Sequence, residues 1–121
     1  MVEHDWLTVR GHIPSKSNNY KIIKINGHAS LDKSDSVKAY EQAFYWQAGT
    51  YRNMGIAGCF EIYVRVYFET TSPDLDNSLK TLLDCLQYTK TIKNDNKCVK
   101  IVAEKFVDRT DPRIEFRITE V

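Results

Sequence analysis

Four side chains in this 121-residue chain have types and spacings that suit metal-assisted chemistry on phosphates. Asp74 and Asp76 are separated by one residue, Lys80 follows one helical turn after Asp76, and Asp95 lies farther along the chain. Mg²⁺ takes oxygen ligands such as carboxylates and keeps several waters. A bound metal can lower the pKa of its water and neutralise charge on phosphorus oxygens, while a lysine can steady a phosphate. These residue types therefore suit phosphodiester hydrolysis.

The elements around the aspartates are predicted by hydrophobic periodicity. Residues 60–68 alternate as a half-buried strand does, with apolar side chains on one face: Phe60, Ile62, Val64, Val66 and Phe68. After a break at 70–73, leucines recur at the spacing of an amphipathic helix: Leu75, Leu79, Leu82, Leu83 and Leu86. We therefore expect the aspartates at the corner where the strand ends and the helix begins.

The start of this helix has two possible interpretations. If Ser72 is the N-cap and Pro73 the first helical residue, Asp74 and Asp76 point about 200° apart, which prevents a shared metal. If Asp74 is the N-cap, its carboxylate stays outside the helix and can converge with that of Asp76 on one cation near the helix N-terminus. We favour the second interpretation.

A purely structural explanation of the acidic residues is also available. Acidic side chains are common in the first turn of any helix, and Asp76 with Lys80 is a favourable i, i+4 ion pair. The polar face that these two share with Asn77 and Asp84 would then be only solvated. An EF-hand loop is disfavoured, because Leu79 stands where its glycine should be.

A resemblance to a known family favours the catalytic interpretation. The chain carries Ser72-Pro73-Asp74-Leu75-Asp76-Asn77, then Lys80 and Asp84, and Asn94-Asp95 after the helix. In these residues it resembles the RusA family of Holliday-junction resolvases. The Pro/Ser/Asn-rich segment from Pro14 to Tyr20 and the closing strand that ends Ile118-Thr119-Glu120 extend it over nearly the whole chain.

The resemblance implies a homodimeric, Mg²⁺-dependent endonuclease that makes paired cuts at a four-way DNA junction in recombination and repair. It implies that Asp74, Asp76 and Asp95 are the catalytic, metal-binding aspartates and that Lys80 is the essential lysine. It also implies a RusA-like α+β fold, with a small mixed sheet of about five strands and two main helices. We expect residues 1–121 to form one such domain, with the helices on one face of the sheet.

The remaining elements are predicted from alternation and turn residues. We expect strands at 7–13, at 20–25 and at 28–31, with Asn26-Gly27 as a two-residue hairpin turn between the last two. A helix should start at a Ser34 or Asp35 cap and run to about Thr50. Residues 99–107 and 113–121 should form strands joined as a hairpin.

Chain length limits where Asp95 can lie. From Asp76 to about Tyr88 the helix rises about 18 Å, and Thr89 to Asp95 can span at most roughly 23 Å. Unless that loop doubles straight back, Asp95 should stay near the helix C-terminus, far from Asp74. A two-fold partner that supplies its own Asp95 would be the easiest way to complete a three-carboxylate site.

Net charge and composition limit which binding partners we expect. The net charge of +1 is low for a nucleic-acid-binding protein, although basic residues outnumber acidic ones between Lys80 and Arg113. Our candidate DNA contacts are Lys16, Asn18, Asn19, Lys90, Lys93 and Lys97.

No 18-residue apolar run or secretory signal occurs, so we expect a cytoplasmic protein with no membrane segment, and the resemblance implies a bacterial or phage-encoded one. Three scattered cysteines indicate neither a disulfide framework nor a zinc site.

Three interpretations thus remain open. The first is the metal-dependent junction endonuclease. The second is a catalytically weak DNA-binding or assembly module of the same fold, suggested by the near-neutral charge and by the absence of the arginine run that members of the family can carry before the first aspartate. The third is an unrelated small α+β protein whose acidic face is only solvated.

Overall fold

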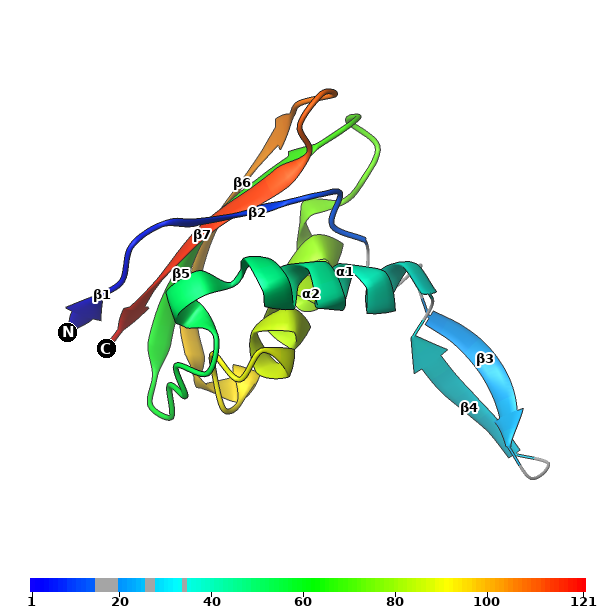
Figure 1. The fold of residues 1–121 in the computed structure, drawn as a ribbon, viewed down its shortest axis with the longest axis horizontal. Helices are drawn as coiled ribbons and strands as arrows, with labels where there is room; N and C mark the ends of the chain where they lie inside the picture. The colour runs from blue at the N-terminus through cyan, green and yellow to red at the C-terminus, as the bar shows by residue number, and fades with distance from the viewer. Residues whose placement is uncertain (15–19, 26–27, 34) are drawn as a thin grey trace.

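The computed structural model shows two helices on one side of a mixed β-sheet (Figure 1). It describes residues 1–14, 20–25, 28–33 and 35–121, and side chains within 1–14 and 35–121. The elements are β1 (Val2–Glu3), β2 (Leu7–Arg10), β3 (Tyr20–Ile25), β4 (His28–Lys33), α1 (Asp35–Gln47), the 3₁₀ turn η1 (Gly49–Tyr51), β5 (Phe60–Phe68), α2 (Leu75–Tyr88), the 3₁₀ turn η2 (Asp95–Lys97), β6 (Cys98–Val107) and β7 (Arg113–Glu120). No helix in these ranges is long and apolar enough to cross a membrane.

The strand β5 forms the centre of a five-stranded sheet. β6 pairs with one edge of β5 in parallel, and β7 pairs with the other edge antiparallel. β1 and β2 both pair antiparallel with the outer edge of β7. The predicted α+β class, with two main helices and about five strands, is therefore confirmed, whereas the paired strands β3 and β4 form a separate two-stranded sheet.

The predicted hairpin between the last two strands is wrong. β6 and β7 lie on opposite edges of β5, and their connection crosses the end of β5, where the Asp108 N–H donates to the Phe68 carbonyl at 2.7 Å. The physical reason lies in burial. β7 buries Ile114, Phe116 and Ile118, so it needs neighbours on both edges, whereas the largely exposed β6 can occupy the outside of the sheet.

The core lies between the sheet and both helices. Every second side chain of β5, from Phe60 to Phe68, is buried on the helix face, and the alternate ones are half-buried on the opposite face. α1 contributes Tyr40 and Phe44, while α2 contributes Leu82 and Leu86 to the same cluster. The predicted placement of the helices on one face is therefore confirmed (Figure 1).

Some local details differ from the predictions. The strand predicted over 7–13 ends at Arg10, because Gly11 takes a φ of +115° that stops the strand. The helix predicted to reach about Thr50 ends at Gln47, and Gly49, with a φ of +57°, opens the turn η1. The buried face of α2 includes Ser78, Thr81 and Cys85 as well as Leu82 and Leu86, so it is rotated from the leucine stripe. The turn Asn26-Gly27 and the cap residue Ser34 lie outside the described residues.

Candidate active site

Asp74 occupies the N-cap of α2. Its φ of −83° and ψ of 134° are extended, and the helix begins at Leu75, so the favoured helix start is confirmed and Ser72 stays outside the helix. The Asp74 side chain makes no capping hydrogen bond and is exposed. Its carboxylate oxygens therefore remain free of the helix backbone at the end of the helix where the dipole favours anions and cation-bridged phosphates.

Asp76 and Lys80 lie on the exposed side of the first two turns of α2. The Asp76 Oδ1 accepts a hydrogen bond of 3.0 Å from the Asn77 N–H. Among the ion pairs between described residues, none joins Asp76 to Lys80. The helical ion pair that would explain these residues as purely structural is therefore not formed.

A pocket of about 430 Å³ opens beside Asp74. Its lining includes His12, Pro14, Phe68 and Asn77, so the N-terminal segment and the end of β5 reach the same place. The buried hydroxyl of Thr81 on α2 donates to the Pro14 carbonyl at 2.8 Å, which anchors the start of the Pro/Ser/Asn-rich segment at this pocket. Sequence reasoning did not single out His12 for the site, because a lone histidine carries no spacing signal.

Lys105 is a positioning residue that sequence reasoning also missed. Its ammonium donates to the Thr71 carbonyl at 2.7 Å and to the Pro73 carbonyl at 2.6 Å. These contacts hold the loop before Asp74 against the end of β6. The parallel pairing of β6 with β5 brings Lys105 there, opposite Val66, and no local pattern around residue 105 indicates this.

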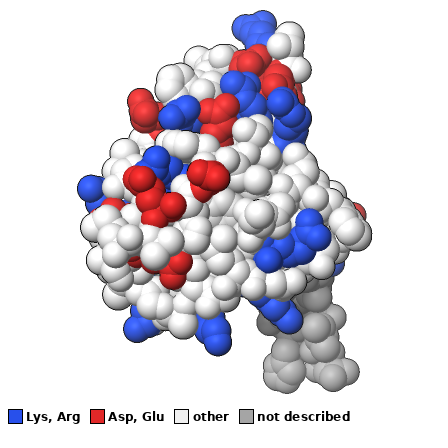
Figure 2. All heavy atoms as spheres, turned by 60° about the vertical axis from the view of Figure 1, so that its left-hand side comes forward, with Lys and Arg blue, Asp and Glu red and all other residues white. Residues whose placement is uncertain are grey.

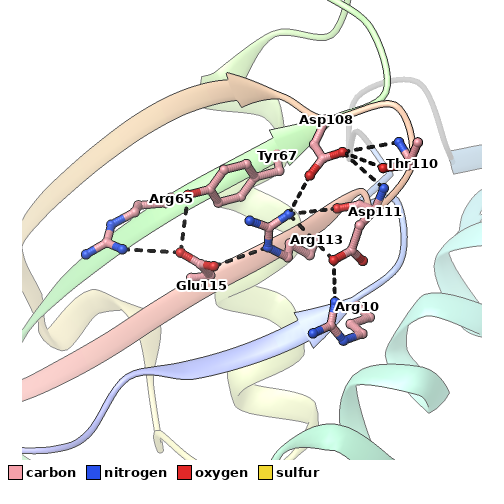
Figure 3. Close-up of polar contacts among 8 residues, drawn as sticks. All are labelled: Arg10, Arg65, Tyr67, Asp108, Thr110, Asp111, Arg113 and Glu115. Carbon is pink, nitrogen blue, oxygen red and sulfur yellow. Dashed lines mark hydrogen bonds and ion pairs between the residues drawn. The ribbon is translucent and has the colours of Figure 1, made fainter.

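An ion-pair network braces the same end of the sheet (Figure 3). Asp108 accepts from Arg113 at 2.9 Å and from the Thr110 and Asp111 N–H groups at 3.2 Å. The hydrogen bond from Arg113, followed by those from Thr110, lowers the pKa of Asp108. Arg113 also donates to Glu115 and lies over the Tyr67 ring at 3.8 Å. The connection between β6 and β7, which crosses the end of β5 near the Asp74 loop, is thereby fixed.

Asp95 lies at the other end of α2, as the chain-length argument predicts. It opens η2, and its N–H donates at 3.0 Å to the Oε1 of Gln87 in the last turn of α2. The register of the parallel pair places Cys98 beside Phe60, at the start of β5, whereas Asp74 follows the end of β5. Within one chain, the described residues contain no group of three Asp, Glu, His or Cys side chains that could hold a metal.

The three lysines predicted after the helix lie at the same end of α2 as Asp95. Lys90, Lys93 and Lys97 are exposed, and the first two line a shallow pocket of about 440 Å³ together with Gln87. Lys90 has a φ of +58° in the turn that ends α2, where the Thr91 N–H donates to the Leu86 carbonyl at 2.9 Å. The other candidate contacts, Lys16, Asn18 and Asn19, lie outside the described residues.

In Figure 2, charges of both signs mix over the upper and left part of the face, and separate Lys or Arg side chains lie along its lower and right parts. That face carries no continuous basic surface of the kind that supports strong non-specific binding to DNA. The neutral balance of the sequence is therefore reflected in the arrangement of the side chains there.

The donor set of the site fits a hard divalent cation in part. Asp74 and Asp76 offer exposed carboxylate oxygens at one helix N-terminus, which is the chemistry that Mg²⁺ prefers. Two carboxylates with waters are within what Mg²⁺ accepts in proteins, and a third would have to come from outside this corner.

Comparison with known proteins found one matching family profile. The sequence profile described as "Endodeoxyribonuclease RusA" matches residues 12–119, a range that includes both ends of α2 and the three aspartates. No curated protein matches the chain significantly.

Proposed function

The chain belongs to the RusA family of endodeoxyribonucleases, and from this premise we propose that it is a Mg²⁺-dependent endonuclease that resolves four-way DNA junctions by paired cuts. One observation supports the proposal above all. Asp74 is the N-cap residue of α2, but its carboxylate makes no hydrogen bond to the helix, and the exposed Asp76 follows two residues later. Such an enzyme would act where DNA recombines, in the cytoplasm of a bacterial or phage-infected cell.

Each side chain has a distinct role in this proposal. Asp74, Asp76 and Asp95 would hold the cation, which would supply an acidified water and neutralise charge on the scissile phosphate. Lys80 lies about 40° from Asp76 around the helix, so its ammonium can contact the phosphate from the same face. The N–H groups at the start of α2 add a favourable field for that phosphate.

The separation of the carboxylates supports a homodimer. Asp95 lies at the C-terminal end of α2 and Asp74 at its N-terminal end, so one chain does not bring them together. A partner related by two-fold symmetry would bring its own Asp95, with the neighbouring Lys90, Lys93 and Lys97, to this chain's Asp74. Two such sites related by the same axis suit paired incision of a junction that is itself two-fold symmetric.

A second candidate function has two observations in its favour. The mixed charges of Figure 2 and the net charge of +1 fit a module of this fold that binds branched DNA or assembles with other proteins and cuts weakly. The two candidates differ in turnover, not in fold.

A cleavage assay separates them. We expect the protein to nick synthetic four-way junctions symmetrically with Mg²⁺, to stop when the metal is chelated, and to leave a linear duplex of the same sequence intact. Junction binding measured without Mg²⁺ should weaken with salt, by roughly 0.9 log units per neutralised phosphate for each log unit of salt. Binding without cleavage would favour the second candidate, and a flat salt titration would count against both.

A further inference from the structure

The pocket beside Asp74 is larger than a hydrated cation needs. Its volume is about 430 Å³, whereas six waters around Mg²⁺ take up about 180 Å³ at roughly 30 Å³ per water. Sites that bind organic groups in proteins start at about 300 Å³. The pocket therefore has room for a further group of the substrate next to the cation.

The walls of the pocket suit a flat, uncharged group. Ile13, Pro14 and Phe68 are buried and give it an apolar side, while Asn77 lines it with an amide. Among the described residues that line it, none is a lysine or an arginine, and Asp74 is an acid. A second phosphate would therefore be repelled, whereas a heteroaromatic ring would find both apolar contact and hydrogen-bonding groups.

Two polar side chains of the pocket have no hydrogen-bond partner among the described residues. They are the half-buried amide of Asn77, whose backbone N–H donates to Asp76, and the imidazole of His12. The neighbouring Ser78 hydroxyl is buried and already used, because it donates to the Leu75 carbonyl at 2.6 Å. Polar side chains away from water usually have a partner, so the Asn77 amide is available to a ligand.

The backbone on both sides of His12 is fixed. The preceding Gly11 N–H donates to the Pro112 carbonyl at 2.8 Å, and the following Ile13 is buried in the core. The His12 ring lies 5.9 Å from the Phe68 ring at an angle of 59°, and it remains exposed. An aromatic side chain is thus held at the pocket with ring surface free for stacking.

We propose that this pocket takes a nucleobase that has left the stack of the branched DNA, next to the phosphate that is cut. The Asn77 amide offers two donors and one acceptor to the edge of the base, and the His12 ring stacks on its face. The inference rests on the proposed function, because Asp74 lines the pocket and is also a ligand of the proposed cation. It adds a second means, besides the cation, by which the site recognises its substrate.

Extrusion of a base gives the site a preference for branch points. A base leaves a duplex most readily where it is mispaired or already unstacked. The base pairs at the crossover of a four-way junction lack the continuous stacking of a linear duplex, so extrusion costs less there. The pocket therefore favours binding at the crossover over binding along a helical arm.

Mismatched and abasic junctions test the pocket with the wild-type protein alone. In a junction of fixed sequence, each base pair next to the crossover is replaced in turn by a mismatch, which lowers the cost of extrusion. At one position in each cut strand, the mismatch should tighten binding without Mg²⁺ on the order of tenfold in gel-shift titrations. An abasic residue at that position also loosens the DNA but leaves no base for the pocket, so it should bind about tenfold less tightly than the mismatch.

Filling the pocket provides a matched pair of variants. Ser72 lines the pocket, so the indole of Ser72→Trp should occupy it and reduce the gain from the mismatch to less than about twofold. Thr71→Trp adds the same side chain at an exposed neighbouring position outside the described lining, and it should keep the gain of about tenfold. Thermal unfolding checks that both variants are folded.

Substitutions of His12 and Asn77 test the two contacts with the base. His12→Phe keeps a flat ring and should keep most of the gain from the mismatch, whereas His12→Ala should lose most of it. Asn77→Ala should lower the gain as well, because the edge of the base loses its hydrogen bonds. If His12→Ala and Asn77→Ala both keep the full gain, the pocket does not hold the base.

The outcomes separate this inference from the proposed function. Equal binding of the mismatched and abasic junctions, or a Ser72→Trp protein that keeps the full gain, would overturn the base pocket even if the protein cuts junctions. A protein that shows the expected gain but does not cut with Mg²⁺ would support the pocket and overturn the nuclease. A protein that binds no junction would overturn both.

Discussion

At the scale of single residues, a backbone torsion decides what the Asp74 carboxylate can do. An N-cap aspartate ordinarily accepts a hydrogen bond from the first turn of its helix, which occupies one of its oxygens. In this chain that bond is absent, and among the described residues the Asp76 Oδ1 accepts from the Asn77 N–H in the first turn of α2. Asp74 can therefore bind a cation without first breaking a contact that stabilises the helix, and Asp76 can do so through its other carboxylate oxygen.

Asp76→Asn should separate cutting from binding. The amide keeps the size of the carboxylate but removes the charge that attracts the cation, so Mg²⁺-dependent cleavage should fall by at least about a hundredfold. Junction affinity should be unchanged or tighter, because repulsion with phosphate is reduced. Cleavage rates and gel-shift titrations on the same junction measure both effects, and wild-type cutting would remove Asp76 from the metal site.

Lys80→Ala provides the comparison at the neighbouring position. It should also lower the cleavage rate, but the Mg²⁺ concentration for half-maximal activity should stay near that of the wild type, because the lysine contacts phosphate rather than metal. Unchanged turnover would make Lys80 a simple surface residue.

At the scale of elements, local patterns predicted β5 and α2 well and the neighbours of β6 badly. The alternation at 60–68 and the leucine spacing after 74 arise within single elements, so the corner that holds Asp74, Asp76 and Lys80 could be derived from sequence. The pairing of β6 with β5 depends on contacts between distant segments, and nearness in sequence wrongly favoured β7. The role of Lys105 was missed for the same reason, since it exists only because β6 ends beside the Asp74 loop.

Tyr51 and Tyr40 form a matched pair that tests how the elements are joined. The buried Tyr51 hydroxyl donates to the Asp5 carbonyl at 2.8 Å and accepts from the Ile118 N–H at 3.1 Å, so it links η1, the N-terminal segment and β7. The Tyr40 hydroxyl is buried with no hydrogen-bond partner among the described residues. Burial raises the pKa of both phenols, so both stay neutral at ordinary pH.

Tyr51→Phe should therefore lower the free energy of unfolding by about 1 to 3 kcal/mol, since it leaves buried polar groups unpaired. Tyr40→Phe should change it by less than about 0.5 kcal/mol or raise it, because no hydrogen bond is lost. Urea unfolding of the two variants measures the difference. A loss for Tyr40→Phe as large as that for Tyr51→Phe would show that the Tyr40 hydroxyl has a partner in solution.

At the scale of the whole molecule, the length of α2 limits how the acidic site can be built. The 14-residue helix holds Asp74 and Asp95 at opposite ends, about 20 Å apart along its axis. In the proposed dimer, a two-fold partner would remove this distance without any change within the chain, and it would bring its own Lys90, Lys93 and Lys97 to each site. A junction would then meet more positive charge near each acidic site than the net charge of a single chain indicates.

Mixing two inactive variants tests whether the site is shared. In a heterodimer of Asp76→Asn and Asp95→Asn chains, a shared arrangement leaves one site with both changes and one site intact, so single nicks should return after subunit exchange. Mixing Asp76→Asn with Asp74→Asn is the matched control, because both changes affect the same half-site and every site in that heterodimer stays defective. With exchange verified by mass spectrometry of tagged chains, nicking in the first mixture alone requires sites built across the two-fold axis. The absence of nicking in both mixtures would mean that each chain completes its own site. The loop after Thr89 would then fold back along α2 when DNA binds.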